Sequence, residues 1–282
     1  VFAPYFYASR VIFSESSAVS SISASFLGWV QRFGKRDHVS QKLDFIAPLS
    51  VHVDSKVPSI EGAEASFWSA QGVLQDQKTF RLVFVGTHSR AFDFSDLPDA
   101  LSRLRAEGIA IQVVIAGHGE KNKQLKKIFS AFDEVVFPGW INSAQANFLY
   151  SISHGIFAPY AELEDFHMSL PNKIIDALAR GIPIISSLSG EFDLLVRRGC
   201  GFQYKTSKQL VEAVKQLLNS SVSESCRNAC VEVYEADYQV EAVMSKFSSV
   251  AVRLAASDRS QARNIERSRY DSIAHETLKK RF

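Results

Sequence analysis

A proline, an asparagine and a lysine stand together at Pro171, Asn172 and Lys173, directly before a short apolar stretch with helical spacing. Proline suits the first turn of a helix, because its ring presets φ and it has no N–H to leave unpaired. The free backbone N–H groups of a helix start, with a lysine beside them, can bind an anion such as a diphosphate. We therefore predict a helix that begins here, with Ser169 or Leu170 as its cap, and a candidate anion site at its start.

Asp176 lies one turn into this predicted helix, and Gly181 stands where helices commonly end in a left-handed residue. A carboxylate in this place can accept hydrogen bonds from two neighbouring hydroxyls, such as those of a ribose. A purely structural explanation also holds, because the helix dipole favours aspartate near a helix start, and Lys173 need only be exposed. The segment alone leaves both explanations open.

The surrounding sequence predicts how this helix is positioned. Short apolar runs alternate with amphipathic stretches, and the runs are Phe80–Gly86, Ile109–Gly117, Glu134–Gly139, His154–Tyr160, Ile182–Ser187 and Gly201–Lys205. Strands that are apolar throughout and alternate with helices indicate a parallel sheet covered on both faces. We predict an α/β fold with a ligand cleft at the carboxyl ends of the strands.

Glycine and polar residues gather where the predicted strands and the loops beside them end. These positions are Gly86-Thr87-His88-Ser89-Arg90, Gly117-His118-Gly119, Gly139-Trp140-Ile141 and Gly190-Glu191. Glycine permits close backbone approach or positive φ, and a flat base can lie against the backbone at Gly139 and Trp140. We expect these residues to line one edge of one sheet. His88 and His167 fall in loops of this cleft, although a structural or merely exposed histidine is the better explanation for each.

The sequence before residue 79 has a different organisation. Ser9–Glu15 is predicted as a strand that enters a helix running to about Phe33, and Lys42–Asp54 as a second strand with its exit. One strand–helix–strand unit is too small to bury its own faces. The polar stretch 55–78 indicates a linker or surface loop. After residue 219 the spacing is helical, and from Ser257 the tail is polar.

Bulk composition sets limits on the class of protein. The 282 residues are 46% hydrophobic and 22% charged, and the net charge of +2 favours neither nucleic acid nor an acidic partner. No apolar run approaches the roughly 18 residues that span a bilayer. Cys200, Cys226 and Cys230 have no metal-ligand spacing and are predicted as buried free thiols. The only methionines are Met168 and Met244, so we expect a fragment or a processed product.

The order of motifs FVG, IAGHGE, VVFPGWI, FAPY, SLPNKIIDALARGIPII, GE and GCGFQY resembles the donor-binding domain of GT-B glycosyltransferases of the GT4 type. The resemblance covers about Ser9 to Leu218, and ASRVIFSE is similar to the end of the acceptor domain. It implies a Rossmann-like parallel sheet with helices on both faces, preceded by a partial second Rossmann-like domain. The implied domains are 1–54 (the end of the acceptor-side domain), 55–78 (linker), 79–237 (nucleotide-sugar binding) and 238–282 (C-terminal helices and tail).

The resemblance also implies a role for individual residues. The carboxylate of Asp176 would bind the donor ribose, and the base would lie by Gly139, Trp140 and Ile141. The backbone of the remaining loop would approach the sugar or the diphosphate, which sets the expected binding residues as Gly86, Thr87, Ser169, Leu170, Pro171, Asn172 and Glu191. The expected catalytic groups are Lys173 and Arg90, since the family's usual basic pair is replaced by Thr87 and Phe92. Met168 stands where many members have an acidic residue.

The activity implied is transfer of a sugar from a UDP- or GDP-type donor to a glycan or lipid-linked saccharide, with retention of configuration and without a metal or a cofactor. The chain contains no Asp-x-Asp, one common signature of a metal-bound diphosphate. We expect a cytoplasmic protein, with peripheral contact to the inner face of a membrane and no nucleic acid partner. Two alternatives stay open: a non-catalytic module of the same fold, and an epimerase or phosphorylase of the same architecture.

Overall fold

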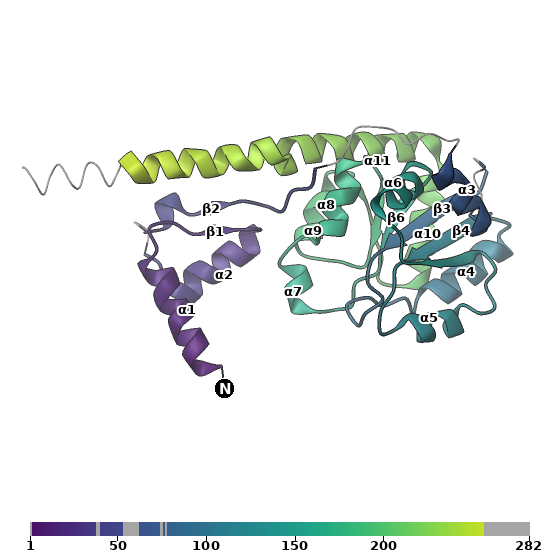
Figure 1. Cartoon of the computed structure of the whole chain (residues 1–282), viewed down its shortest axis with the longest axis horizontal. Coiled ribbons are helices and arrows are strands. Elements are labelled where there is room, and N and C mark those ends of the chain that lie inside the picture. The colour runs from purple at the N-terminus through teal and green to yellow at the C-terminus, as the bar shows by residue number, and fades with distance from the viewer. Residues whose placement is uncertain (1, 38–39, 53–61, 74–75, 77, 257–282) are drawn as a thin grey trace, which may run out of the picture. The chain divides into compact units, whose positions relative to one another are not determined.

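The computed structural model of the chain describes residues 2–37, 40–52, 62–73, 76 and 78–256 (Figure 1). The chain forms two compact units, one made of Val1–Ala47 with Glu241–Phe282 and the other of Pro48–Val240. None of the helices in the described ranges is both long enough and apolar enough to cross a membrane.

The second unit contains a six-stranded, entirely parallel sheet (Figure 1). Its strands are β3 (Phe80–Val85), β4 (Ile111–Ala116), β5 (Val135–Gly139), β6 (Gly155–Ala158), β7 (Ile184–Ser186) and β8 (Gly201–Gln203). All six predicted strands are confirmed. Their spatial order is β5-β4-β3-β6-β7-β8, so the direction of the connections reverses between β3 and β6. This is the Rossmann order, in which a ligand crevice opens at the carboxyl ends of the two central strands.

Helices flank the sheet on both faces. They are α4 (Leu97–Ala106), α5 (Asn122–Ile128), α6 (Ser143–Ser151), α7 (Glu164–His167), α8 (Asn172–Ala179), α9 (Glu191–Arg197), α10 (Ser207–Leu218) and α11 (Ser220–Val233), the last running into a π-helical turn at Tyr234–Tyr238. α4 packs with α10, and α8 packs with α11. Right-handed connections place α4 and α5 on one face and α6 and α8 on the other.

The core explains the continuous apolar runs in the sequence. Every residue of β4 is buried, and in β3 all but Val85 are buried. Central strands of a parallel sheet are covered on both faces, so they leave no position for a polar, solvated side chain. The three cysteines are free and buried, as predicted.

Part of the stretch predicted as a linker is helical. α3 (Ala63–Ala70) packs on α6, and the fully buried Trp68 donates its indole N–H to the carbonyl of Gln145 at 3.0 Å. The buried Trp68 holds this short helix against the domain. The polar residues around it led to the prediction of a linker or loop. Residues 53–61, 74, 75 and 77, in this stretch or directly before it, lie outside the described ranges.

The helix predicted at Pro171 is α8, with a shifted start. Pro171 itself is the N-cap, with φ −66° and ψ 153°, and Asn172 is the first helical residue, so neither Ser169 nor Leu170 is the cap. Proline fits this place because the cap needs an extended backbone and no N–H. Gly181 has φ +60° and ends the helix as predicted. The Ile182 N–H donates to the carbonyl of Ala177 at 3.0 Å, the closing bond of a Schellman motif.

The first unit departs from prediction at its start. Ser9–Glu15 belongs to α1 (Ala3–Glu15), which has no buried residue, and is not a strand. A short apolar run fits a helix or a strand equally well, and here the preceding residues extend it as a helix from Ala3. The strand–helix–strand unit does form, from β1 (Ser20–Ser21), α2 (Ala24–Gly34) and β2 (Phe45–Ile46), with parallel strands.

A buried ion pair holds this small unit together. Arg36 and Asp44 are almost completely buried, and two guanidinium nitrogens lie 2.8 Å from the two carboxylate oxygens. Asp44 also accepts the backbone N–H of Val19 at 2.9 Å, so the pair fastens the entry of β1. Residues 240–256 are helical, as predicted, and 257–282 lie outside the described ranges.

Candidate functional site

Three glycines close the neighbouring strands β3, β4 and β5 at their carboxyl ends. The Gly86 N–H donates to Ala116 at 3.0 Å, and the Gly117 N–H donates to Gly139 at 2.7 Å, so the pairing continues beyond the strands. Gly117 has φ +126°, and a Cβ there would lie 1.9 Å from the carbonyl oxygen of Gly86. Only glycine fits this contact. At this point of the sheet edge backbone therefore contacts backbone, as the sequence predicted.

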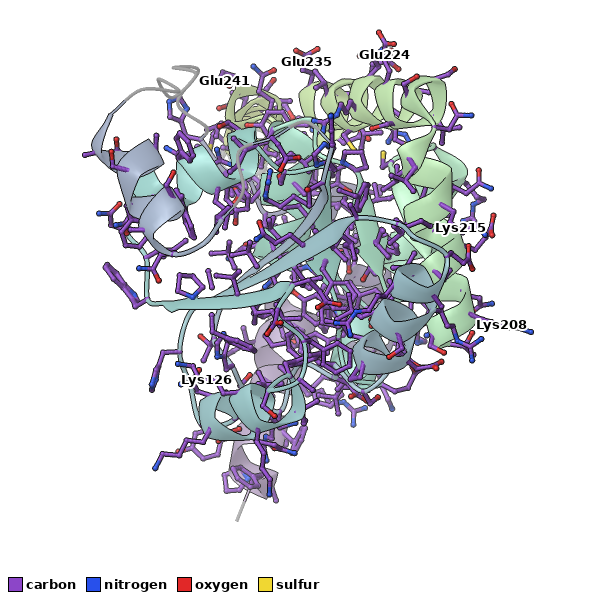
Figure 2. All side chains as sticks on the ribbon, turned by 90° about the vertical axis from the view of Figure 1, so that its right-hand side faces the viewer. Lys126, Lys208, Lys215, Glu224, Glu235 and Glu241 are labelled. Carbon is purple, nitrogen blue, oxygen red and sulfur yellow. The ribbon has the colours of Figure 1, made fainter. Side chains whose placement is uncertain are left out.

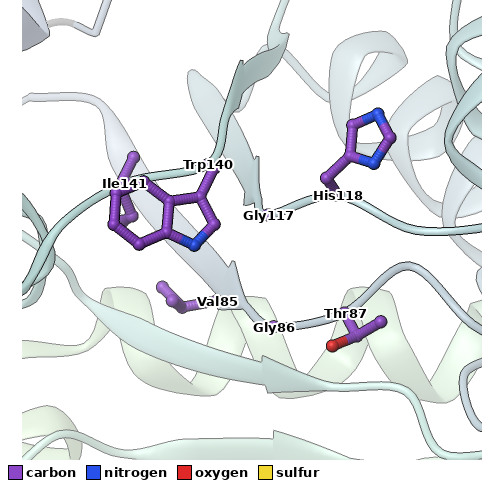
Figure 3. A pocket seen from close by; sticks show the side chains of 7 residues that line it. All are labelled: Val85, Gly86, Thr87, Gly117, His118, Trp140 and Ile141. Carbon is purple, nitrogen blue, oxygen red and sulfur yellow. The ribbon is translucent and has the colours of Figure 1, made fainter.

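A pocket of about 220 Å³ lies against this edge (Figure 3). It is lined by Val85, Gly86, Thr87, Gly117, His118, Trp140 and Ile141. Figure 3 shows the indole of Trp140 on one side of the pocket and His118 and Thr87 on the other. Trp140 is 77% exposed, although a large aromatic ring is usually covered. A flat, solvated ring beside bare backbone is suited to stacking on a planar ligand.

The amine of Lys173 reaches from α8 to the carboxyl end of β3. Its Nζ donates to the carbonyl of Val85 at 2.7 Å and lies 3.5 Å from the ring centre of Phe84 and 4.6 Å from that of Phe92. A Cβ on Gly86 would come within 2.7 Å of this nitrogen, so the amine rests against a residue that lines the pocket. Burial lowers the pKa of Lys173 to about 7, against the opposing attraction of the Asp176 carboxylate.

Asp176 is already paired. Its Oδ1 accepts a hydrogen bond from Nε of Arg180 at 3.0 Å, and that guanidinium lies 4.7 Å from the ring centre of Tyr150. Burial and the charge of Asp176 raise the pKa of Tyr150. The Asp176 side chain is about one quarter exposed, so the carboxylate remains within reach of solvent.

The loops around α7 and α9 form a second polar group. Nδ1 of His167 lies 2.5 Å from the hydroxyl of Ser189, and its Nε2 lies 3.2 Å from Glu162. A Cβ on Gly190 would be 2.1 Å from the carbonyl oxygen of His167, so glycine allows these loops to touch. Glu191 follows as the first residue of α9. His167 is thus engaged within its own loops.

The structure brings together only part of the predicted site. Gly86, Thr87, Trp140 and Ile141 line the pocket, and Lys173 lies against it. Among the described residues, the lining does not include Gly139, Ser169, Leu170, Pro171, Asn172, Asp176 or Glu191. Arg90 is exposed outside the lining, and its backbone N–H donates to the carboxylate of Glu120 at 3.1 Å.

The two histidines expected in the cleft are not pocket residues. His88 is buried, with Nδ1 3.0 Å from the Asn122 side-chain oxygen, and burial lowers its pKa. His118 lines the pocket instead. The signal for His118 was present in the sequence, because it stands between two glycines at the end of a central strand. Across the described ranges, no group of three or more His, Cys, Asp or Glu side chains is arranged to hold a metal ion.

Comparison with known proteins identifies the family. The family model described as glycosyl transferases group 1 matches residues 79–220, just over half of the chain. The chain belongs to this family. No curated protein matches the sequence.

Solved structures share the fold at low sequence identity. Sucrose-phosphate synthase from Thermosynechococcus elongatus is 17% identical with a TM-score of 0.69, over 90% of this chain and 62% of that one. HepE from Anabaena, in complex with UDP and glucose, is 14% identical with a TM-score of 0.64, over 88% and 66%. WaaG, a glycosyltransferase involved in lipopolysaccharide biosynthesis, is 15% identical with a TM-score of 0.59, over 83% and 61%. The fold is therefore that of GT-B glycosyltransferases, and the chain spans less than two thirds of each of these structures.

Proposed function

We propose that the protein transfers a sugar from a nucleoside diphosphate donor, of UDP or GDP type, to a hydroxyl of a glycan or lipid-linked saccharide. The observation that carries this proposal is the pocket at the carboxyl ends of β3 and β4, where an exposed indole and a lysine amine flank glycine-lined backbone. The family supports it, and so does a structure of the same fold that was solved with UDP and glucose.

The donor would lie with its base on Trp140 and its diphosphate towards α8. The N–H groups of Asn172 and Lys173 belong to the first turn of this helix, where backbone dipoles favour an anion. The amine of Lys173 adds a positive charge when it is protonated. Asp176 would accept hydrogen bonds from the ribose hydroxyls. For this, its carboxylate must either accept them alongside the hydrogen bond from Arg180 or lose that hydrogen bond.

Departure of the diphosphate is the step that these groups would assist. Negative charge develops on the leaving oxygen, and preorganised donors stabilise that charge more in the transition state than in the ground state. We assign this role to Lys173 and the start of α8, with Arg90 as a further cation that the adjoining loop can bring in. The proposal includes retention of configuration, no cofactor and no metal ion. It places the protein in the cytoplasm, in peripheral contact with a membrane.

Calorimetric titration with UDP, GDP, ADP and their sugars tests the proposal. We expect one nucleotide to bind with a Kd on the order of micromolar, and Asp176→Asn to weaken that binding. Ser102→Ala, on the exposed side of α4, is a matched control that should leave the binding unchanged. A folded chain that binds none of the nucleotides would contradict a donor site.

A non-catalytic module of the same fold is the second candidate. The pairing of Asp176 with Arg180 favours it, together with Met168, Thr87 and Phe92 at positions where cations or carboxylates were expected. The two candidates differ in turnover. Nucleotide binding without release of free sugar or sugar transfer would favour the module, and release of nucleoside diphosphate from the sugar donor would favour the enzyme.

A further inference from the structure

A second pocket lies at the opposite edge of the same sheet. Its volume is about 300 Å³, and it is lined by Lys78, Phe80, His154, Leu217, Leu218, Ser220, Ser223, Glu224 and Arg227. These residues come from the starts of β3 and β6 and from the junction of α10 with α11. β3 therefore has one pocket at each end, and the residues of the proposed donor site take no part in this one.

His154 presents a defined hydrogen-bond donor to this pocket. Its Nδ1 accepts the backbone N–H of Arg81 at 3.0 Å, so Nδ1 carries no proton. Burial, and then the charges of Arg81 and Arg227, lower the pKa of His154, which favours the neutral ring. In a neutral ring the proton is then on Nε2, which can only donate.

Among the described residues, two arginines beside His154 have no carboxylate partner; Arg227 lines the pocket and Arg81 lies next to the lining residue Phe80. Arg81 is almost completely buried, and within the described part of the chain one of its terminal nitrogens has no hydrogen-bond partner. Arg227 donates to the carbonyls of Ser153 at 3.0 Å and Gly181 at 3.3 Å. Neither forms an ion pair with a described residue. Asp76, which attracts Arg81, is fully exposed and is bonded to Thr79. Buried charge without a counter-ion is unfavourable, so this edge favours an anion.

The other residues that line this pocket supply more hydrogen-bond donors than acceptors. The hydroxyls of Ser220 and Ser223 and the amine of Lys78 make no hydrogen bond to another described residue, and all three residues line the pocket. Glu224 is the one carboxylate among the lining residues, and Figure 2 shows it directed outward from α11. Phe80, Leu217 and Leu218 form the apolar wall. An anion with several oxygens and an apolar group matches this combination.

We propose that this amino-edge pocket binds a small organic phosphate, with the phosphate on Lys78, Arg227, His154 and the two serines and the apolar group on Phe80 and the leucines. A phosphate offers three oxygens, which suits the number of donors better than the two of a carboxylate. The site is separate from the candidate donor pocket and does not depend on the proposed transfer.

The test is a titration of the whole chain with phenyl phosphate, followed by NMR of the histidine rings. His154 reports on this pocket and His118 on the donor-side pocket. We expect saturable shifts of His154, with a Kd on the order of 1 mM, and unmoved signals of His118. Inorganic phosphate should produce the same shifts more weakly, because it lacks the apolar group. Stronger binding of inorganic phosphate would assign the pocket to the free ion and overturn the organic ligand.

Two variants make the test specific. Lys78→Ala, and the double variant Ser220→Ala with Ser223→Ala, should each weaken phenyl phosphate binding about tenfold, since each removes donors to a charged group. Lys208→Ala is the matched control, because Lys208 is exposed at the other end of α10 (Figure 2). If Lys208→Ala weakened phenyl phosphate binding equally, the effect would be general charge attraction and the specific site would be overturned. Shifts at His118 alone, or at neither histidine, would overturn the site.

Discussion

The two ends of β3 carry pockets built on different principles. At the carboxyl end the lining includes the backbone of Gly86 and Gly117, and the cation is a lysine whose pKa burial lowers to about 7. At the amino end the lining is side chains, and the cations include an arginine that stays charged at any ordinary pH. The first edge therefore depends on the close contact of glycine backbones and on the protonation of one lysine, and the second depends on individual side chains, among them a permanently charged arginine. The predictions below test that contrast, from the largest expected effect to the smallest.

Gly117→Ala should give the largest effect. The added Cβ would overlap the Gly86 carbonyl, and the residue would keep a φ of +126° that L side chains rarely adopt. We expect a loss of about 4 kcal/mol in the free energy of unfolding, because backbone cannot move aside cheaply. Gly139→Ala is the matched control, with positive φ but nothing within 4 Å, and should cost about 1–2 kcal/mol. Urea unfolding measures both, and equal costs would refute the close contact.

Lys173→Met should raise stability at low pH. The folded pKa of about 7 lies below the usual 10.5, so the unfolded chain binds more protons between these values and wild-type stability increases as pH rises through that window. The variant lacks this dependence. At pH 6 it should be more stable than wild type by about 2–3 kcal/mol, after allowing for the lost hydrogen bond to Val85, and the gain should vanish near pH 10.

Urea unfolding at several pH values measures this difference. Lys208→Met, which changes the same charge on an exposed helix position, should leave the pH dependence of stability as it is in the wild type. A constant difference between Lys173→Met and wild type from pH 6 to pH 10 would show that the buried amine keeps its ordinary pKa.

Donor affinity should fall as pH rises through 7. Only the protonated amine of Lys173 attracts a diphosphate, and the phosphates of a nucleotide sugar do not titrate in this range. We expect about a tenfold loss between pH 6.5 and pH 8.5 in the wild type and little change in Lys173→Arg, whose charge is permanent. Calorimetry at each pH gives the affinities. An identical slope in both proteins would assign the dependence to another group.

Sequence patterns predicted the strands of the sheet far better than the side-chain contacts at the carboxyl ends of those strands. The strands could be predicted because buried parallel strands are continuous apolar runs. The positions of Gly86 and Gly117 at the sheet edge could be predicted because glycine permits close backbone contacts where strands end. The contact of the Lys173 amine with the rings of Phe84 and Phe92 was not predicted, because these residues stand about ninety and about eighty positions earlier in the chain. For His88 the structural explanation that the sequence favoured is the one observed, but its partner Asn122 and its contact with Gly119 leave no local pattern and were not predicted.

The most direct test of the account is the fluorescence of Trp140 during titration with UDP and GDP. Of the three tryptophans, Trp68 is buried and Trp29 is partly exposed, but only Trp140 lines the pocket, and Trp140→Ala identifies its share of the signal. We predict quenching by one nucleotide in the wild type and a loss of affinity of about tenfold in Trp140→Ala, without loss of stability, as expected for one stacked base. Nucleotide binding of undiminished affinity in Trp140→Ala would contradict a base site on this edge of the sheet.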